Sequence, residues 1–183
     1  YVSHNVGNAR LAIKDAAENP NRMFIAVDPC LSETARMAEM HIMPKNGTDS
    51  LLLRAIIAFI LKNGWEDKEF IENYTTGWEQ GKKWFEKFDI DEALRVCRVP
   101  KEQIVKFARI LCTKKWGVHA DLGLFFGRHA TLSCYLLNVL IVITGNLFKP
   151  GTNEIAHNYI SWGEYTDENT PNIWRTWKTN SFP

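Results

Sequence analysis

Residues 23–62 read MFIAVDPCLSETARMAEMHIMPKNGTDSLLLRAIIAFILK, and this stretch decides the fold. The run 23–27 is short, apolar and bounded by turn residues, which predicts a fully buried strand of the parallel-sheet type. We expect a short helix at 32–40, a second strand at 41–43 and a strongly apolar helix at 50–62. Strands that alternate with helices in this way indicate β-α units on a parallel sheet.

The rest of the chain continues the alternation. We expect helices at 8–17, 67–74, 100–113 and 130–143, a short helix and loop across 75–98, a third strand at 116–121 and a glycine-punctuated loop at 122–127. The predicted fold class is therefore α/β, a three-layer, mostly parallel sheet with helices on both faces, of the Rossmann-like kind.

The periodic pattern is lost after Pro150-Gly151. We therefore expect one domain at 1–155, followed at 156–183 by an irregular tail that leads toward a neighbouring domain. The tail is rich in aromatic residues, including Trp162, Trp174 and Trp177.

Composition excludes several classes of protein. The chain has 183 residues, and its 22 basic and 21 acidic side chains leave a net charge of 22 − 21 = +1, which argues against a nucleic-acid partner bound through a broad basic face. The longest apolar stretch, at 132–143, is shorter than the roughly 20 residues of a membrane span. Cys30, Cys97, Cys112 and Cys134 form no C-x-x-C pair, so we assign no metal ligands.

Polar residues follow each predicted strand, and ligands of parallel sheets bind outside the carboxyl ends of the strands. The carboxylates of Asp28 and Asp49 each accept two adjacent hydrogen bonds, which suits a guanine edge or the two hydroxyls of a ribose. Gly47 permits close approach of the backbone, and Thr48 begins a helix whose free N–H groups favour phosphate. The alternative is structural: Asp28-Pro29 is a common strand-ending turn, and Thr48 or Asp49 is an ordinary N-cap.

No catalytic residue is indicated within this chain. A G-x-G-x-x-G fingerprint is absent, so the sequence does not predict an ordinary NAD site. Three histidines are candidates for acid–base catalysis: His41, His119 and His129. None has a carboxylate or nucleophile at a spacing that indicates a catalytic pair, so each is better explained as a core or surface residue.

Several ordered motifs together resemble one known family. Val27-Asp28-Pro29, Thr34-Ala35, Ala38 and Gly47-Thr48-Asp49 follow the pattern [VI]DPR-x-[ST]-x-TA-x-x-AD-x-x-[LI]-x-x-x-PGTD of the molybdopterin oxidoreductases, the superfamily of dimethyl sulfoxide reductase and formate dehydrogenase. Segments 62–79 and 99–111 are similar to the parts that follow, as are Thr144-Gly145-Asn146 and Pro150-Gly151. Cys30 stands where Arg is common in the family, and Phe126 where Gln is common.

The resemblance implies a cofactor of molybdenum or tungsten held by two pterin guanine dinucleotides. It places Asp28, Pro29, Gly47, Thr48 and Asp49 at the guanine–ribose end of one dinucleotide. Leu122, Gly123 and Phe126 then approach the pterin side.

The family pattern also implies that this region is the Rossmann-like third domain of a longer parent, which catalyses a two-electron redox reaction. The chain alone is then expected to be inactive. Its partners are the remaining domains of the parent and an iron–sulfur electron-transfer subunit, and an iron–sulfur cluster in the preceding part fits the family. The substrate, the choice of metal and the localisation are not indicated.

Two other functions remain open at this point. A few relatives keep this fold as a scaffold without metal, which is the second hypothesis. The third hypothesis is an α/β interaction module that binds a partner. The paired Asp28 and Asp49 favour the cofactor-binding domain.

Overall fold

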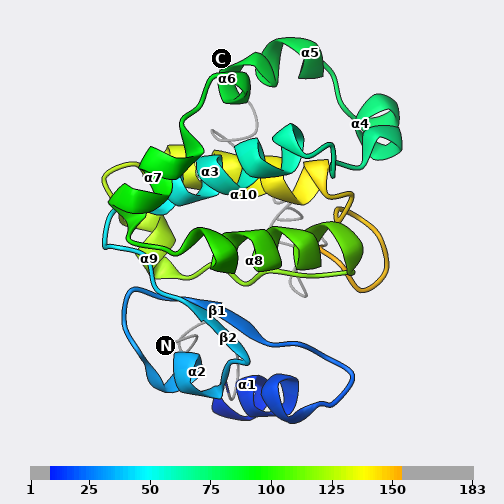
Figure 1. Cartoon of the computed structure of the whole chain (residues 1–183). Helices are drawn as coiled ribbons and strands as arrows, with labels where there is room; N and C mark the ends of the chain where they lie inside the picture. Colours follow the sequence, from blue (N-terminus) through cyan, green and yellow to red (C-terminus); the bar gives the residue numbers. More distant parts are fainter. Residues whose placement is uncertain (1–8, 154–183) are drawn as a thin grey trace, which may run out of the picture. The chain divides into compact units, whose positions relative to one another are not determined.

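The structure is a computed structural model, and it describes residues 9–153. Its helices and strands, in chain order, are α1 (Ala9–Glu18), β1 (Ile25–Val27), α2 (Glu33–Met37), β2 (Met40–Ile42), α3 (Asp49–Lys62), α4 (Lys68–Tyr74), α5 (Trp78–Gly81), α6 (Lys83–Glu86), α7 (Ile90–Cys97), α8 (Lys101–Thr113), α9 (Leu122–Phe125) and α10 (Ala130–Ile143) (Figure 1). The aromatic tail at 156–183 lies outside the described residues, and the domain division near residue 155 stays a prediction.

The two strands confirm the α/β class. β1 pairs in parallel with β2, with Ile25 opposite Met40 and Val27 opposite Ile42. The pairing continues beyond the strands, because Asp28 N donates to the Ile42 carbonyl at 3.0 Å. The short helix α2 connects the two strands, so the segment is a β-α-β unit as the sequence predicts.

The core lies among α3, α7, α8 and α10. α3 packs against both α10 and α7, and it also contacts α8. The largest fully buried side chains are Ile42, Ile56, Ile57, Ile60, Cys97, Ile104, Leu136 and Ile143. Burying each of these isoleucines and this leucine contributes roughly 1.5–3 kcal/mol, so the interhelical contacts supply most of the apolar stabilisation. No helix within residues 9–153 combines the length and the apolar character needed to cross a bilayer.

The predicted third strand at 116–121 is wrong. The described sheet has two strands, and residues 116–120 run without regular secondary structure. The physical reason lies in their hydrogen bonds: Trp116 N and Val118 N donate to the side-chain oxygens of Asn146 and Asn153 instead of to a neighbouring strand. Alternating apolar residues alone did not distinguish the two arrangements.

Two further expectations need correction. Residues 122–125 form the short helix α9, with Asp121 accepting a hydrogen bond from Leu122 N at 2.8 Å, where a loop was expected. The region 75–98 holds α5, α6 and α7, where one short helix and a loop were expected. α7 is amphipathic, and its buried residues Ile90, Ala93, Leu94 and Cys97 recur at helical spacing.

Candidate functional site

Asp28 lies directly after β1 and is tied into its own turn. Its Oδ1 accepts from Cys30 N at 2.8 Å, and its Oδ2 accepts from Ser32 Oγ at 2.8 Å. Ser32 in turn caps α2, since its Oγ accepts from Ala35 N at 3.2 Å. The side chain therefore fulfils the structural role of a strand-ending turn, but each carboxylate oxygen keeps a lone pair for a further donor. Pro29 beside it is exposed.

The segment from Pro44 to Thr48 leads from β2 into α3. Gly47 has φ +76, and a Cβ added there would meet no atom within 4 Å, so the space beside it is open. Thr48 is buried, and its Oγ1 donates to the Lys45 carbonyl at 2.6 Å. Although Thr48 stands at the N-cap position, it makes no side-chain capping bond to α3. The first-turn N–H groups of α3 are thus left available for an anion.

Asp49 is the first residue of α3 and is partly exposed. Within residues 9–153, no hydrogen bond or ion pair engages its carboxylate. Because β1 and β2 pair in parallel, their carboxyl-terminal ends lie side by side. The Asp28 turn and the segment that leads to Gly47–Asp49 both begin at this end, here called the strand edge. The structure therefore places the Asp28 turn beside the start of the segment that leads to Gly47–Asp49.

Sequence reasoning missed the residues that hold this edge. His41 Nε2 donates to the Asp28 carbonyl at 2.8 Å, and Gln103 Nε2 donates to the His41 carbonyl at 2.7 Å. His41 is thus a structural residue, as its isolation indicated. The signal available in the sequence was its place inside the second predicted strand; in the structure it is paired with Ala26, the middle residue of β1.

Cys97 is a second residue that was missed, and it anchors the loop before α3. It is fully buried at the end of α7, its carbonyl accepts from Lys45 N at 2.8 Å, and its Sγ lies 3.8 Å from the Thr48 carbonyl. Burial raises the pKa of the Cys97 thiol, and the Asp49 carboxylate acts in the same direction. The protonated thiol is therefore kept as a donor to the loop.

Leu122, Gly123 and Phe126 belong to a different part of the structure. Leu122 and Gly123 open α9, Phe126 ends it, and α9 packs against α10. Phe126 is 80% exposed, and Leu122 is also exposed, so these side chains are available for contact. Among the described residues, no hydrogen bond or ion pair joins Leu122, Gly123 or Phe126 to Asp28 or Asp49.

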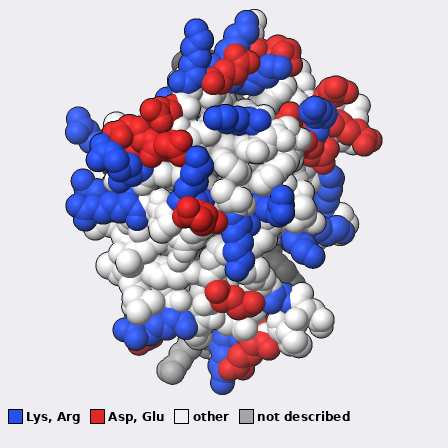
Figure 2. All heavy atoms as spheres, in the orientation of Figure 1, with Lys and Arg blue, Asp and Glu red and all other residues white. Residues whose placement is uncertain are grey.

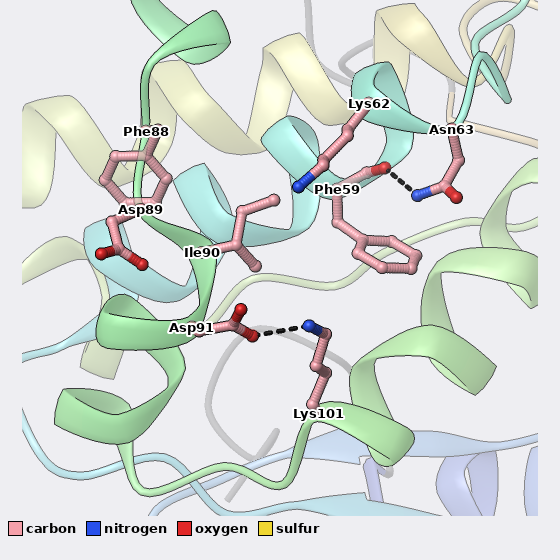
Figure 3. Close-up of a pocket in the computed structure, with 8 residues that line it drawn as sticks. All are labelled: Phe59, Lys62, Asn63, Phe88, Asp89, Ile90, Asp91 and Lys101. Atoms are coloured by element: carbon pink, nitrogen blue, oxygen red, sulfur yellow. Dashed lines mark hydrogen bonds and ion pairs between the residues drawn. The ribbon is translucent and has the colours of Figure 1, made fainter.

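One surface pocket lies elsewhere. It has a volume of about 370 Å³ and lies where the C-terminal end of α3 faces the starts of α7 and α8 (Figure 3). Its polar lining includes the exposed ion pair Lys101–Asp91, at 2.7 Å, a kind of pair that contributes under about 1 kcal/mol. None of the predicted site residues lines this pocket, so it does not support their assignment.

Two further features are the charge on one face of the molecule and its metal-ligating groups. On the face shown in Figure 2, acidic and basic side chains lie interspersed, with no large patch of one sign. Within residues 9–153, no group of three or more His, Cys, Asp or Glu side chains is arranged to hold a metal ion.

Curated relatives of the chain are oxidoreductases by name. The chain is 32% identical over 148 residues to the F420-dependent formate dehydrogenase 2 subunit alpha of Methanococcus maripaludis, covering 79% of this chain and 21% of that protein. It is 32% identical over 146 residues to formate dehydrogenase H of Escherichia coli, covering 76% and 20%. It is 28% identical over 150 residues to the trimethylamine-N-oxide reductase of Haemophilus influenzae, covering 78% and 18%.

A solved structure shares the fold. Acetylene hydratase from Pelobacter acetylenicus superposes with a TM-score of 0.68 at 22% identity, covering 78% of this chain and 19% of that one. Comparison with family models finds no match. The chain spans about a fifth of the length of the curated relatives it matches. These relatives and this fold are those of one family: the chain belongs to the molybdopterin oxidoreductases.

Proposed function

We propose that the chain is a cofactor-binding domain of a molybdenum or tungsten oxidoreductase. The guanine–ribose end of one pterin guanine dinucleotide is assigned to Asp28, Pro29 and Gly47–Asp49. The observation that carries the assignment is that β1 and β2 end side by side, so that the Asp28 turn and the segment leading to an uncapped α3 both begin there. Ligands of parallel sheets bind at this edge.

The donors and acceptors at this edge fit such a ligand. The Asp49 carboxylate accepts from the paired N–H groups of guanine or from ribose hydroxyls, and the remaining lone pairs of Asp28 do the same. The first-turn N–H groups of α3 bind a phosphate oxygen, and the open space at Gly47 admits it. When bound, the cofactor supplies the two-electron redox chemistry; these residues bind and orient its nucleotide end.

The larger assembly is also a proposal. In it, the strand pair is part of a three-layer, mostly parallel sheet with helices on both faces, and α9 faces the pterin side through Leu122, Gly123 and Phe126. The partners are the remaining domains of the parent chain and an iron–sulfur electron-transfer subunit. The relative from Methanococcus maripaludis is named as a subunit alpha, which supports a partner subunit.

A scaffold relative without metal is the second candidate function. It is favoured by the way the Asp28 carboxylate is used inside its own turn. The Asp49 carboxylate, which has no partner among residues 9–153, favours the cofactor-binding domain instead. Binding of a guanine nucleotide separates the two.

The test is titration of the chain with GDP, with ADP as the matched ligand. We expect GDP to bind more tightly than ADP, and Asp49→Ala to weaken GDP by about tenfold or more, because a charge-assisted hydrogen bond contributes about 1.5–3 kcal/mol. The control is Asp91→Ala, which removes another exposed carboxylate from the first turn of a helix. If Asp49→Ala binds GDP as well as the parent chain does, the site assignment is wrong.

A further inference from the structure

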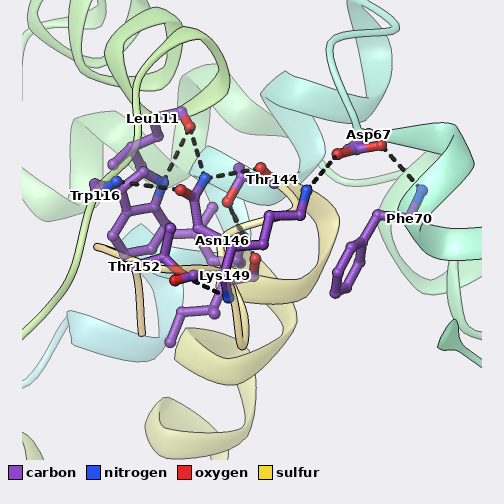
Figure 4. Close-up of polar contacts among 10 residues, drawn as sticks. Asp67, Phe70, Leu111, Trp116, Thr144, Asn146, Lys149 and Thr152 are labelled. Carbon is purple, nitrogen blue, oxygen red and sulfur yellow. Dashed lines mark hydrogen bonds and ion pairs between the residues drawn. The ribbon is translucent and has the colours of Figure 1, made fainter. Parts of the chain in front are cut away.

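Two side-chain amides hold the backbone between α8 and α9. Trp116 N donates to Asn146 Oδ1 at 3.1 Å (Figure 4), Asn153 Nδ2 donates to the Trp116 carbonyl at 3.2 Å, and Val118 N donates to Asn153 Oδ1 at 2.8 Å. One edge of a β-strand offers just these groups to its neighbour, the N–H and C=O of one residue and the N–H of the second residue after it. The two asparagines therefore take the place of a neighbouring strand.

Both amides are held in place by other bonds. Asn146 is 4% exposed, its Nδ2 donates to the Thr144 carbonyl at 2.8 Å, and its backbone N donates to the Ile141 carbonyl at 3.0 Å. Asn153 is tied to Asn146, since its Nδ2 and its backbone N reach the Asn146 carbonyl at 2.9 and 3.1 Å. The segment that follows α10 thus carries a preoriented pair of amides.

The helix α10 also contacts α9. α9 packs against α10, and its first residue, Leu122, follows closely on Val118. Asn146 and Asn153 therefore hold the chain just before α9, and α10 holds α9 itself. A shift of residues 116–118 would carry α9 with it.

We propose that Asn153, together with Asn146, is a positioning residue for α9, and so for Leu122, Gly123 and Phe126 on the pterin side of the site. This inference rests on the proposed function. Asn153 is the one to test because it is partly exposed, so water replaces its hydrogen bonds in a variant. Removal of the buried Asn146 would instead leave buried backbone groups unpaired and endanger folding.

The experiment compares the 183-residue chain with Asn153→Ala and with Asn138→Ala. Asn138 is an exposed matched control whose Nδ2 bonds only within its own helix, to the Cys134 carbonyl at 2.9 Å. Three quantities are measured: hydrogen exchange of the Val118 amide, the Kd for GDP and the Kd for metal-free pterin guanine dinucleotide. GDP reports on the Asp28 and Asp49 edge alone, whereas the dinucleotide also reports on α9.

For Asn153→Ala, we expect Val118 exchange to rise and dinucleotide binding to weaken, each by about tenfold, while GDP binding stays within about twofold of the parent. Asn138→Ala should change none of the three. Unchanged Val118 exchange or unchanged dinucleotide binding in Asn153→Ala overturns the proposal. So does an equal weakening of GDP and dinucleotide, which is the signature of a general loss of structure.

Failure of the proposed function has a different signature. If the parent chain binds neither GDP nor the dinucleotide, the assignment of the site fails, and the role of Asn153 toward a cofactor fails with it. Val118 exchange then still shows whether Asn153 holds the segment, which separates this outcome from a failure of Asn153 alone.

Discussion

At the scale of single residues, Gly145 shows how tightly the turn after α10 is packed. It has φ +63, and a Cβ added there would clash with Asp67 Oδ2. Asp67 is not free to move, because its Oδ1 accepts from Phe70 N at 2.9 Å and caps α4, while its Oδ2 lies 3.5 Å from Lys149 Nζ (Figure 4). Both the backbone conformation and the neighbouring carboxylate therefore require glycine here.

We predict that Gly145→Ala lowers the free energy of unfolding by about 2–4 kcal/mol, by adding the displacement of a helix cap to the cost of a left-handed alanine. Gly64→Ala is the matched control: Gly64 has φ +65, and nothing lies within 4 Å of an added Cβ. Gly64→Ala should lower the free energy of unfolding by only about 1 kcal/mol, which is the cost of a left-handed backbone conformation at alanine. Urea denaturation measures the free energy of unfolding of both variants. Equal losses of this free energy would show that the contact with Asp67 is unimportant.

At the scale of elements, the end of α7 both stops a helix and holds the loop before α3. Arg98 takes the left-handed conformation with φ 59, and Val99 N then donates back to the Leu94 carbonyl at 3.1 Å. This leaves the Cys97 carbonyl for Lys45 N, as described above. A non-glycine residue pays a conformational cost at such a position.

We predict that Arg98→Gly raises the free energy of unfolding by about 0.5–1 kcal/mol, because glycine relieves the left-handed strain. Arg95→Gly, inside the same helix, is the control of opposite sign and should lower it by about 1 kcal/mol. Thermal or urea unfolding decides the matter; a loss of stability in both variants would contradict the assigned strain.

Elements differ in how well their sequences predict them. The helices α3, α8 and α10 are confirmed, because long apolar periodicity and clear end signals such as Pro100 and Gly145 agree. The local sequence of the segment 116–121 predicts a strand. Whether its backbone pairs with another strand depends on hydrogen-bond partners that lie far away in the chain. Asn146 and Asn153 supply those partners, and a local pattern does not contain them.

At the scale of the whole molecule, the chain presents apolar side chains where the proposed assembly requires contact. Leu122, Phe125 and Phe126 are exposed on or beside α9, and Val27 and Met43 are exposed at the strand edge. The matched region is about a fifth of each relative. The remaining parts of such an enzyme are proposed to cover these side chains.

We predict that the 183-residue chain shows no turnover of formate when supplied with the cofactor and a viologen dye as electron acceptor. The reason is that the chain matches only about a fifth of the length of each relative, and the residues proposed here are assigned only to binding and orienting the nucleotide end of the cofactor. GDP binding by the same preparation is the control for a folded site. Reduction of the dye faster than with free cofactor would refute this prediction.

The sequence alone determined the β-α-β unit, the main helices and the family, because local periodicity, turn residues and ordered motifs are written along the chain. It also predicts that Asp28 and Asp49 bind a ligand. Only the tertiary structure decided that the Asp28 carboxylate serves its own turn, that Thr48 leaves α3 uncapped and that Cys97 and His41 hold the edge. These outcomes depend on hydrogen bonds between distant residues, whose partners are chosen by packing and not by spacing in the chain.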